Sequence, residues 1–186
     1  MKSLIIIRVA SLFSLSSALM FSTSSVYASD QVYFQGELTD QTCILSVNGS
    51  SNGNPVVNLN PVYASKLKDV GSFADGAVFS LGVTNCASSY AITPEFIAYN
   101  ITGYEGGIGY GIGNIGSAKN VDLQLRNLMS NNLIMVDANG AGSAGVLLVN
   151  ADGSGSIDYA VEYVSYQGNA SPGTVTGLVQ YAISYL

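Results

Sequence analysis

The chain has 186 residues, of which 48% are apolar and 10% charged, and it contains 21 Gly, 12 Tyr and no His. Its length favours one domain, and its low charge, beside roughly 25% in an average soluble domain, favours β-structure over a helical bundle. Without His, the chain lacks the general bases, nucleophile pairs and metal ligands that imidazole supplies. We therefore expect no enzymatic activity, no cofactor and no metal site.

The first 28 residues have the order of a secretory signal peptide. Lys2 and Arg8 are basic, an apolar stretch extends to Phe21, and Val26 and Ala28 place small side chains before a plausible cleavage point. This order is typical of exported proteins, whereas the alternative, an N-terminal membrane anchor, fits the Ser content less well. No later segment approaches the ~20 apolar residues of a membrane span. We therefore predict that residues 1–28 are removed on export and that the mature chain has no membrane span.

The predicted mature chain, from Ser29 onward, is strongly acidic. It keeps four basic and all twelve acidic residues, which gives a net charge of −8. Domains that bind nucleic acid instead present clustered Lys and Arg to the phosphates, so we expect no nucleic-acid partner. The basic residues are scattered along the sequence, at Lys66, Lys68, Lys119 and Arg126.

Cys43 and Cys86 are the only cysteines of the chain, and export places them in an oxidising compartment. We predict a disulfide between them, and a pair of free reactive thiols is the alternative. Closing a loop of this length stabilises a fold by roughly 4 kcal/mol in the chain-entropy model. Because Cys86 follows the apolar run of residues 78–83, we expect the bond to join two neighbouring strands near the start of the mature chain.

Alternation of apolar and polar side chains predicts β-strands along the whole mature chain. The first, at residues 30–38, places Val32, Phe34 and Leu38 on one face. Asn-Gly, Asp-Gly and Pro-Gly pairs separate the strands as turns, and residues 61–68 are the one short helical candidate. The pattern predicts an all-β antiparallel sandwich. Its other strands are expected at residues 56–59, 78–83, 91–98, 121–126, 133–136, 145–149, 157–166 and 179–185.

Two patterns imitate binding motifs. Residues 111–116 satisfy the Gly-x-Gly-x-x-Gly pattern of nucleotide-binding turns, but no predicted helix follows them, so we interpret them as a loop or strand edge. Asp137, Asn139, Asp152 and Asp158 carry ligand oxygens without the spacing of a calcium loop. We interpret these four residues as turn formers.

Four motifs follow one another along the mature chain. Residues 32–38, Val-Tyr-Phe-Gln-Gly-Glu-Leu, precede Cys43, and residues 79–86 lead to the second cysteine. Residues 120–125, Asn-Val-Asp-Leu-Gln-Leu, form the third motif. The fourth is a Gly fourteen residues from the end, followed by alternating apolar residues and a penultimate Tyr; it consists of Gly173, Val179, Ile183 and Tyr185. Together these motifs resemble bacterial fimbrial (pilin) subunits of the chaperone–usher pathway, in the type 1 and P pilus group, whose chaperone-recognition signature has this last form.

The resemblance implies an incomplete immunoglobulin-like β-sandwich, the pilin fold, with one disulfide and without its seventh strand. The missing strand leaves an apolar groove, which in this family a chaperone fills first and the N-terminal extension of the next subunit fills afterwards. For this chain it implies a donor-strand extension at residues 29–37 and a pilin domain at residues 38–186. The donor residues would be Val32, Phe34, Gly36 and Leu38, and the groove strand would present Gly173, Val179, Tyr181, Ile183 and Tyr185.

The resemblance also implies a function, namely a structural subunit of a surface fimbria that supports cell adhesion. The implied partners are a periplasmic pilus chaperone, an outer-membrane usher and neighbouring pilin subunits, and the chain would be secreted through the periplasm to the cell-surface fimbrium. Only about seven mature residues precede Gly36, as in minor or adaptor subunits. A minor or adaptor tip subunit, or an adhesin that binds glycans directly, therefore stays open as the alternative. Residues 30–38 are likewise open to interpretation as the first strand of the chain's own sandwich.

Overall fold

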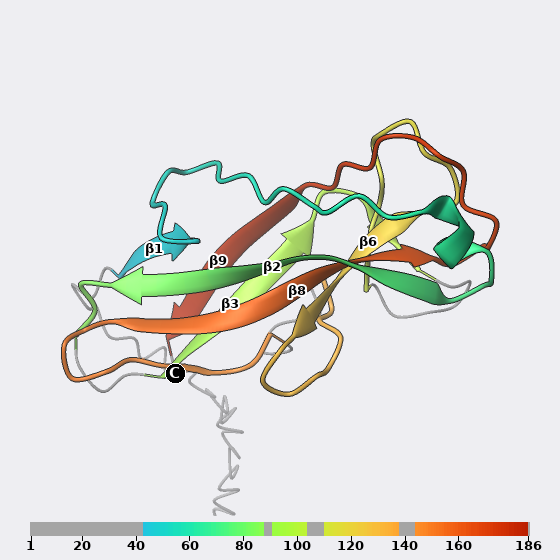
Figure 1. Cartoon of the computed structure of the whole chain (residues 1–186). Helices are drawn as coiled ribbons and strands as arrows, with labels where there is room; N and C mark the ends of the chain where they lie inside the picture. The colour runs from blue at the N-terminus through green and yellow to red at the C-terminus, as the bar shows by residue number, and fades with distance from the viewer. Residues whose placement is uncertain (1–42, 88–90, 104–109, 138–143, 186) are drawn as a thin grey trace, which may run out of the picture. The chain divides into compact units, whose positions relative to one another are not determined.

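The computed structural model describes residues 43–87, 91–103, 110–137 and 144–185, all within one compact unit that begins at Thr39. The predicted signal peptide and the predicted extension at residues 29–37 lie outside the described residues. In the described part of the chain, no helix has the length and apolar character that crossing a membrane requires. The elements in Figure 1 are β1 (Ile44–Val47), the 3-10 helix η1 (Ala64–Leu67), β2 (Ser72–Thr84), β3 (Ala91–Ala98), β4 (Ile101–Thr102), β5 (Gly111–Ile112), β6 (Asp122–Asn127), β7 (Leu147–Leu148), β8 (Gly155–Ser165) and β9 (Val179–Tyr185).

The strands form two antiparallel sheets that pack face to face. One has six strands in the order β1-β2-β8-β6-β5-β4, and the other has three in the order β7-β3-β9. Figure 1 shows β3 and β9 crossing behind β2 and β8. Aromatic contacts join the sheets, because the ring of Phe96 on β3 lies 6.1 Å from that of Phe79 on β2 and 5.1 Å from that of Tyr159 on β8. The predicted all-β sandwich is confirmed.

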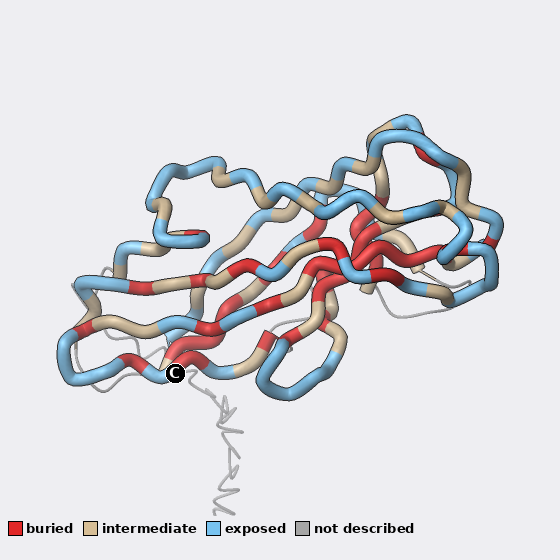
Figure 2. The backbone as a smooth tube through the Cα atoms, in the orientation of Figure 1, coloured by how far each residue is buried: buried red, intermediate tan, exposed pale blue. Residues whose placement is uncertain are grey.

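Side-chain alternation builds the core between the two sheets. Along β8, Ile157, Tyr159 and Val161 are buried, whereas Ser156 and Asp158 are exposed. Successive side chains of a strand point to opposite faces, so this sequence directs one apolar face inward. The tube in Figure 2 shows the same alternation of buried and exposed positions along the long strands.

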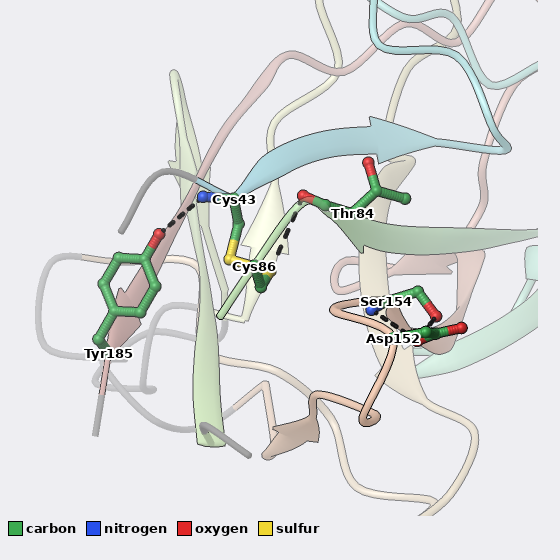
Figure 3. Close-up of a disulfide and its surroundings, with 6 residues drawn as sticks. All are labelled: Cys43, Thr84, Cys86, Asp152, Ser154 and Tyr185. Carbon is green, nitrogen blue, oxygen red and sulfur yellow. Dashed lines mark hydrogen bonds between the residues drawn. A yellow bond between two sulfur atoms is a disulfide. The ribbon is translucent and has the colours of Figure 1, made fainter. Parts of the chain in front are cut away.

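The predicted disulfide between Cys43 and Cys86 is present, with an S–S distance of 2.06 Å and Cα atoms 4.5 Å apart. It connects the residue before β1 to the segment after β2 (Figure 3), and β1 pairs with β2. The bond therefore fastens two neighbouring strands, as the sequence predicted. At the Cys86 end of the disulfide, the backbone N–H of Cys86 donates to the carbonyl O of Gly153 at 3.1 Å. Gly153 has φ +76°, and a Cβ there would collide with the Cys86 carbonyl, so the turn requires glycine.

Most predicted strands are confirmed. Residues 91–98 and 179–185 have the predicted bounds as β3 and β9, and the bounds of β6 and β8 lie within two residues of the prediction. The strand predicted at 78–83 is the later part of β2, which continues back to Ser72 across a bulge between Asp75 and Ala77. The bulge interrupts the period-two pattern, which explains why the sequence indicated only half of this strand.

The strand predicted at residues 56–59 is wrong, although its alternation is real. Pro55 and Pro61 flank it, and proline supplies no N–H to a strand ladder. Val57 and Leu59 nevertheless pack against the core. The alternating pattern therefore reported burial of every second residue rather than strand pairing.

Three further predictions are corrected in extent. Residues 133–136 form one isolated bridge, between Leu133 and Arg126, instead of a strand. Residues 145–149 contribute only the two-residue strand β7, and the helical candidate at 61–68 is reduced to the single 3-10 turn η1. Residues 111–116 contain the short strand β5 and no helix follows them, which confirms their interpretation as a strand edge.

Candidate functional site

The last strand, β9, is an edge strand of its sheet. It pairs with β3 from Val179 to Tyr185, and no other strand of the described residues pairs with its second edge. Its inward side chains, Val179, Tyr181 and Ile183, pack against the core but stay only partly buried. An edge with unpaired backbone groups and half-covered apolar side chains is an incomplete sheet surface.

A groove of about 570 Å³ lies between β9 on one side and β1 on the other, where the segment that follows β1 also contributes. Val179 and Tyr181 of β9 line one wall together with Ile97 of β3, and Leu45 of β1 lines the other together with Ser51, Gly53 and Asn54. We call this feature the β1–β9 groove.

The floor around the β1–β9 groove is apolar. The lining of the groove includes the apolar side chains Leu45, Val179 and Tyr181. Elsewhere at the margin of the core, Val57, Leu59, Val62 and Val175 are also only partly buried. Side chains of this kind are normally fully buried in a finished sandwich. At the groove, this partial exposure leaves the apolar side chains of Leu45, Val179 and Tyr181 without full cover from the described residues.

One end of β9 is fastened to the start of the described chain. The Oη of Tyr185 accepts a hydrogen bond from the backbone N–H of Cys43 at 3.2 Å (Figure 3). The neighbouring Ser184 hydroxyl donates to Oε1 of Glu95 on β3 at 2.6 Å. The first described residue of the chain therefore lies beside the C-terminal end of the open strand.

Gly173 has a different position from the other residues of the predicted groove strand. A Cβ at Gly173 would lie 2.5 Å from the backbone N of Ala118, so glycine is needed for close packing of two backbones. The next residue continues this pairing, since the Ala118 N–H donates to the Thr174 carbonyl at 3.0 Å. Gly173 therefore positions the chain that leads into β9 and does not line the β1–β9 groove.

The groove offers binding surface rather than reactive chemistry. Glu95 is the only carboxylate among its described lining residues, and both cysteines are in the disulfide. In the described ranges, no three Cys, Asp or Glu side chains lie close enough to hold a metal ion. An open strand edge above an apolar floor is instead the arrangement that accepts an extended peptide as an added strand.

The sequence identified one wall of the groove and missed the other. Val179 and Tyr181 line it, Ile183 and Tyr185 continue along the same strand, and their role in receiving a chaperone or a donor strand stays a prediction. Leu45 and Ile97 were missed because a four-residue strand and an isolated exposed Ile give no pattern of their own. The predicted donor residues Val32, Phe34, Gly36 and Leu38 lie outside the described residues.

No protein-family model matches the chain. In sequence, the chain is 32% identical over 163 residues to the major fimbrial subunit SMF-1 of Stenotrophomonas maltophilia (strain K279a), across 85% of this chain and 93% of that protein. In structure, it is similar to the P pilus rod subunit PapA, with a TM-score of 0.55 at 14% identity, across 84% of this chain and 100% of that one. It is also similar to the CupB6 tip adhesin of Pseudomonas aeruginosa, with a TM-score of 0.53 at 14% identity, across 69% of this chain but 34% of that one.

The two structural likenesses bear on the fold alone. The sequence likeness is close enough, and covers enough of both proteins, to establish kinship. The chain belongs to the family of bacterial fimbrial subunits, the pilins.

Proposed function

We propose that this protein is a structural subunit of a bacterial surface fimbria, and that its β1–β9 groove receives the N-terminal extension of a neighbouring subunit. The observation that carries the proposal is the open edge of β9, above apolar side chains that the chain itself leaves half covered. The kinship with a major fimbrial subunit supports the same role.

The predicted extension has the chemistry that the groove requires. Residues 29–37 alternate, so Val32, Phe34 and the adjoining Leu38 share one apolar face. Each backbone hydrogen bond to β9 contributes about 1 kcal/mol, and burial of each apolar side chain contributes about 1.5–3 kcal/mol. Gly36 has no side chain, which allows a close approach of the two backbones at that position.

The same groove explains the proposed partners. An unassembled subunit exposes an apolar edge that invites aggregation, so we propose that a periplasmic pilus chaperone covers it after export and that an outer-membrane usher mediates the exchange. The extension of the next subunit then takes the place of the chaperone. The final location is the cell-surface fimbrium.

The alternative is a minor or adaptor tip subunit, or an adhesin that binds glycans. The short predicted extension favours the first of these, since only about seven mature residues precede Gly36. The adhesin has less support, because the chain corresponds to 34% of the tip adhesin with a similar fold. Both alternatives keep the β1–β9 groove as the site of assembly.

The decisive experiment uses the two faces of the extension. Phe34→Asp places a charge on the apolar face, whereas Gln35→Asp places the same charge on the polar face. In fimbriae isolated from bacteria, we expect Gln35→Asp to give the detergent-resistant, heat-sensitive ladder of wild-type multimers and Phe34→Asp to abolish it. Deletion of residues 29–35 should give a folded subunit that terminates fibres without extending them. Normal incorporation of the deletion variant at internal positions of the fibre would overturn the proposal.

A further inference from the structure

Every lysine that follows the predicted signal peptide lies at one end of the described domain. Lys66 and Lys68 are at η1, and Lys119 precedes β6. The loop at residues 168–171 joins them, because its backbone N–H groups donate to the carbonyls of Lys68 at 2.8 Å and Lys119 at 3.0 Å. All three side chains are exposed, with Asp69 as the adjacent carboxylate. The three lysines are scattered in the sequence, but the fold brings their segments together. We call them the lysine cluster.

The outward face of the six-stranded sheet has the opposite charge. Strand register places the side chains at Glu162, Asp75 and Gln124 side by side on this face, with the aspartates at 122 and 158 on the same side of their strands. Two large apolar side chains are exposed on the same face, Phe73 at 55% and Val78 at 61%. We call this surface the outer face; its charged residues are Asp75, Asp122, Asp158, Glu162 and Arg126.

One acidic side chain of the outer face is already neutralised. The guanidinium of Arg126 donates to Glu162 with an N–O distance of 2.7 Å, and the two side chains are 19% and 5% exposed. The hydrogen bond to Glu162 raises the pKa of Arg126, and the Gln124 amide donates to the same carboxylate at 2.7 Å. Asp75 and Asp158 are exposed and lie outside this pair, although the charge of Asp75 also contributes to raising the pKa of Arg126. The charge that the outer face presents to solvent is therefore negative.

The outer face is also hollowed at the bulge of β2. A hollow of about 540 Å³ lies there, and its lining includes Asp75, Val78 and Leu128 beside the Arg126–Glu162 pair. Lysine carries its ammonium on a four-carbon stem that packs against apolar surface while the charge reaches a polar group. The exposed Val78 and Leu128 can cover such a stem, and Asp75 can receive the ammonium.

We propose that the lysine cluster of one subunit binds the outer face of a second copy of this chain within the fimbria. The inference rests on the proposed function, because a fibre of like subunits surrounds each acidic outer face with other copies. The mature sequence has a net charge of −8, so two copies repel each other except where the lysine cluster is turned toward an acidic surface.

The geometry of this contact favours a fibre rather than a closed pair. The lysine cluster and the outer face are different surfaces, so their contact is heterologous, and repeated heterologous contacts generate rings or open helical assemblies. Each exposed ion pair is weak, but the contact recurs at every subunit of a fibre that donor strands already hold together. The contact therefore sets how neighbouring subunits pack against one another in addition to the strand that links them.

Carbodiimide crosslinking of isolated fimbriae tests the contact directly, because this reagent joins amines to carboxylates that touch. Fimbriae assembled from a mixture of ¹⁵N-labelled and unlabelled subunits distinguish links between subunits from links within one chain. We expect mixed-isotope peptides that join Lys66, Lys68 or Lys119 to Asp75 or Asp158. Links from these lysines only to other carboxylates, such as Asp152, or only within one chain, would overturn the inference.

Charge reversal supplies a second test. The variant Lys66→Glu, Lys68→Glu, Lys119→Glu should keep the heat-sensitive ladder but lose the uniform fibre diameter seen by electron microscopy. The matched triple Lys→Arg variant should assemble as wild type. Adding Asp75→Lys and Asp158→Lys to the triple Glu variant should restore the uniform fibre diameter of the wild type. Unchanged fibres in the Glu variant would overturn the inference alone, whereas absence of the ladder in wild-type fimbriae would overturn the proposed function. If wild-type fimbriae bind a glycan array, and Asp75→Lys with Asp158→Lys abolishes that binding with fibre packing unchanged, the outer face is a ligand site and the inference is wrong.

Discussion

The hydroxyl oxygen of Tyr185 accepts a hydrogen bond from the backbone N–H of Cys43 at 3.2 Å, across 142 positions of sequence. This bond joins the penultimate residue of the chain to the first residue that the structure describes. The disulfide to Cys86 leaves from the same residue. Cys43 is thus held on two sides, by a hydrogen bond to the end of the open strand β9 and by a covalent bond to the segment after β2.

Tyr185→Phe removes this acceptor and leaves the aromatic ring in place. Because a typical hydrogen bond contributes a net 0.5–1.5 kcal/mol, we expect the free energy of unfolding to fall by about 1 kcal/mol. Guanidinium unfolding of the subunit saturated with a peptide of residues 29–38 measures the change. The control is Tyr63→Phe, at a side chain that is 79% exposed. An equal loss in both variants would contradict the role of the Tyr185 hydroxyl.

The disulfide is expected to carry a large share of the stability. Cys43 and Cys86 are separated by 43 positions, and loss of such a cross-link costs roughly 4 kcal/mol in the chain-entropy model. Cys43→Ser and Cys86→Ser should each lower the periplasmic yield sharply, and the double variant should be no worse than either single one. Yields equal to wild type in all three variants would show that the bond is dispensable.

Ile183→Asp tests the apolar floor beneath the open strand. Ile183 points inward and is partly buried, so a strand laid over it would cover a charge in place of an apolar side chain. Loss of that burial is worth about 1.5–3 kcal/mol, so the affinity for a peptide of residues 29–38 should fall at least roughly tenfold. Met129→Asp, at a side chain that is 82% exposed and does not line the groove, is the matched control. Fluorescence anisotropy of the labelled peptide measures both, and equal affinities would place the peptide elsewhere.

Gly153→Ala should destabilise the turn beside the disulfide. The backbone there has φ +76°, and the new Cβ would collide with the Cys86 carbonyl. We expect a loss of more than about 1 kcal/mol, because the strain adds to the steric clash. Gly53→Ala is the comparison, since nothing lies within 4 Å of a Cβ at Gly53. Thermal unfolding of both variants measures the difference, and a Gly153→Ala protein as stable as Gly53→Ala would refute the clash.

Alkaline pH should unfold the subunit through its buried tyrosines. Burial raises the pKa of Tyr159 and that of Tyr163, whereas tyrosines of the unfolded chain ionise near about pH 10. The unfolded state therefore releases protons first, and stability is lost as pH rises above that value, by up to about 1.4 kcal/mol per pH unit for each tyrosine. Unfolding curves at pH 8 to 11 check this. Tyr159→Phe should have a lower stability at pH 8 but a shallower decline, and an unchanged slope would exclude Tyr159 as the cause.

The strands were predictable wherever alternation and pairing coincide, as along β3 and β9. The pattern failed at residues 56–59 and 133–136, because alternation reports which side chains are buried and not whether a neighbouring strand is present to pair. Leu133 makes a single bridge, while Ile134 and Val136 are fully buried. Only the β9 wall of the β1–β9 groove was predictable from the sequence. Leu45 of the opposite wall is distant from β9 along the chain, and the two meet only in the folded protein.

Charge was the property that local sequence described least well. Lys66, Lys68 and Lys119 are separated by up to 53 positions, and backbone bonds to the loop at 168–171 bring their segments together. Gly173 shows the same effect for backbone packing. The sequence marked this glycine by its distance from the C-terminus, but its contact with Ala118 depends on two segments that meet only in the folded protein.

The disulfide also determines how a fimbria built from these subunits responds to pulling. In the proposed fibre, tension that reaches Cys43 through the predicted extension would pass directly to Cys86 by a covalent bond. The 43 positions between them would otherwise lengthen by about 140 Å when stretched out. With the bond intact, the segment between Cys43 and Cys86 cannot extend under load. The mechanical strain is then borne by the contact between the added strand and the groove of the next subunit.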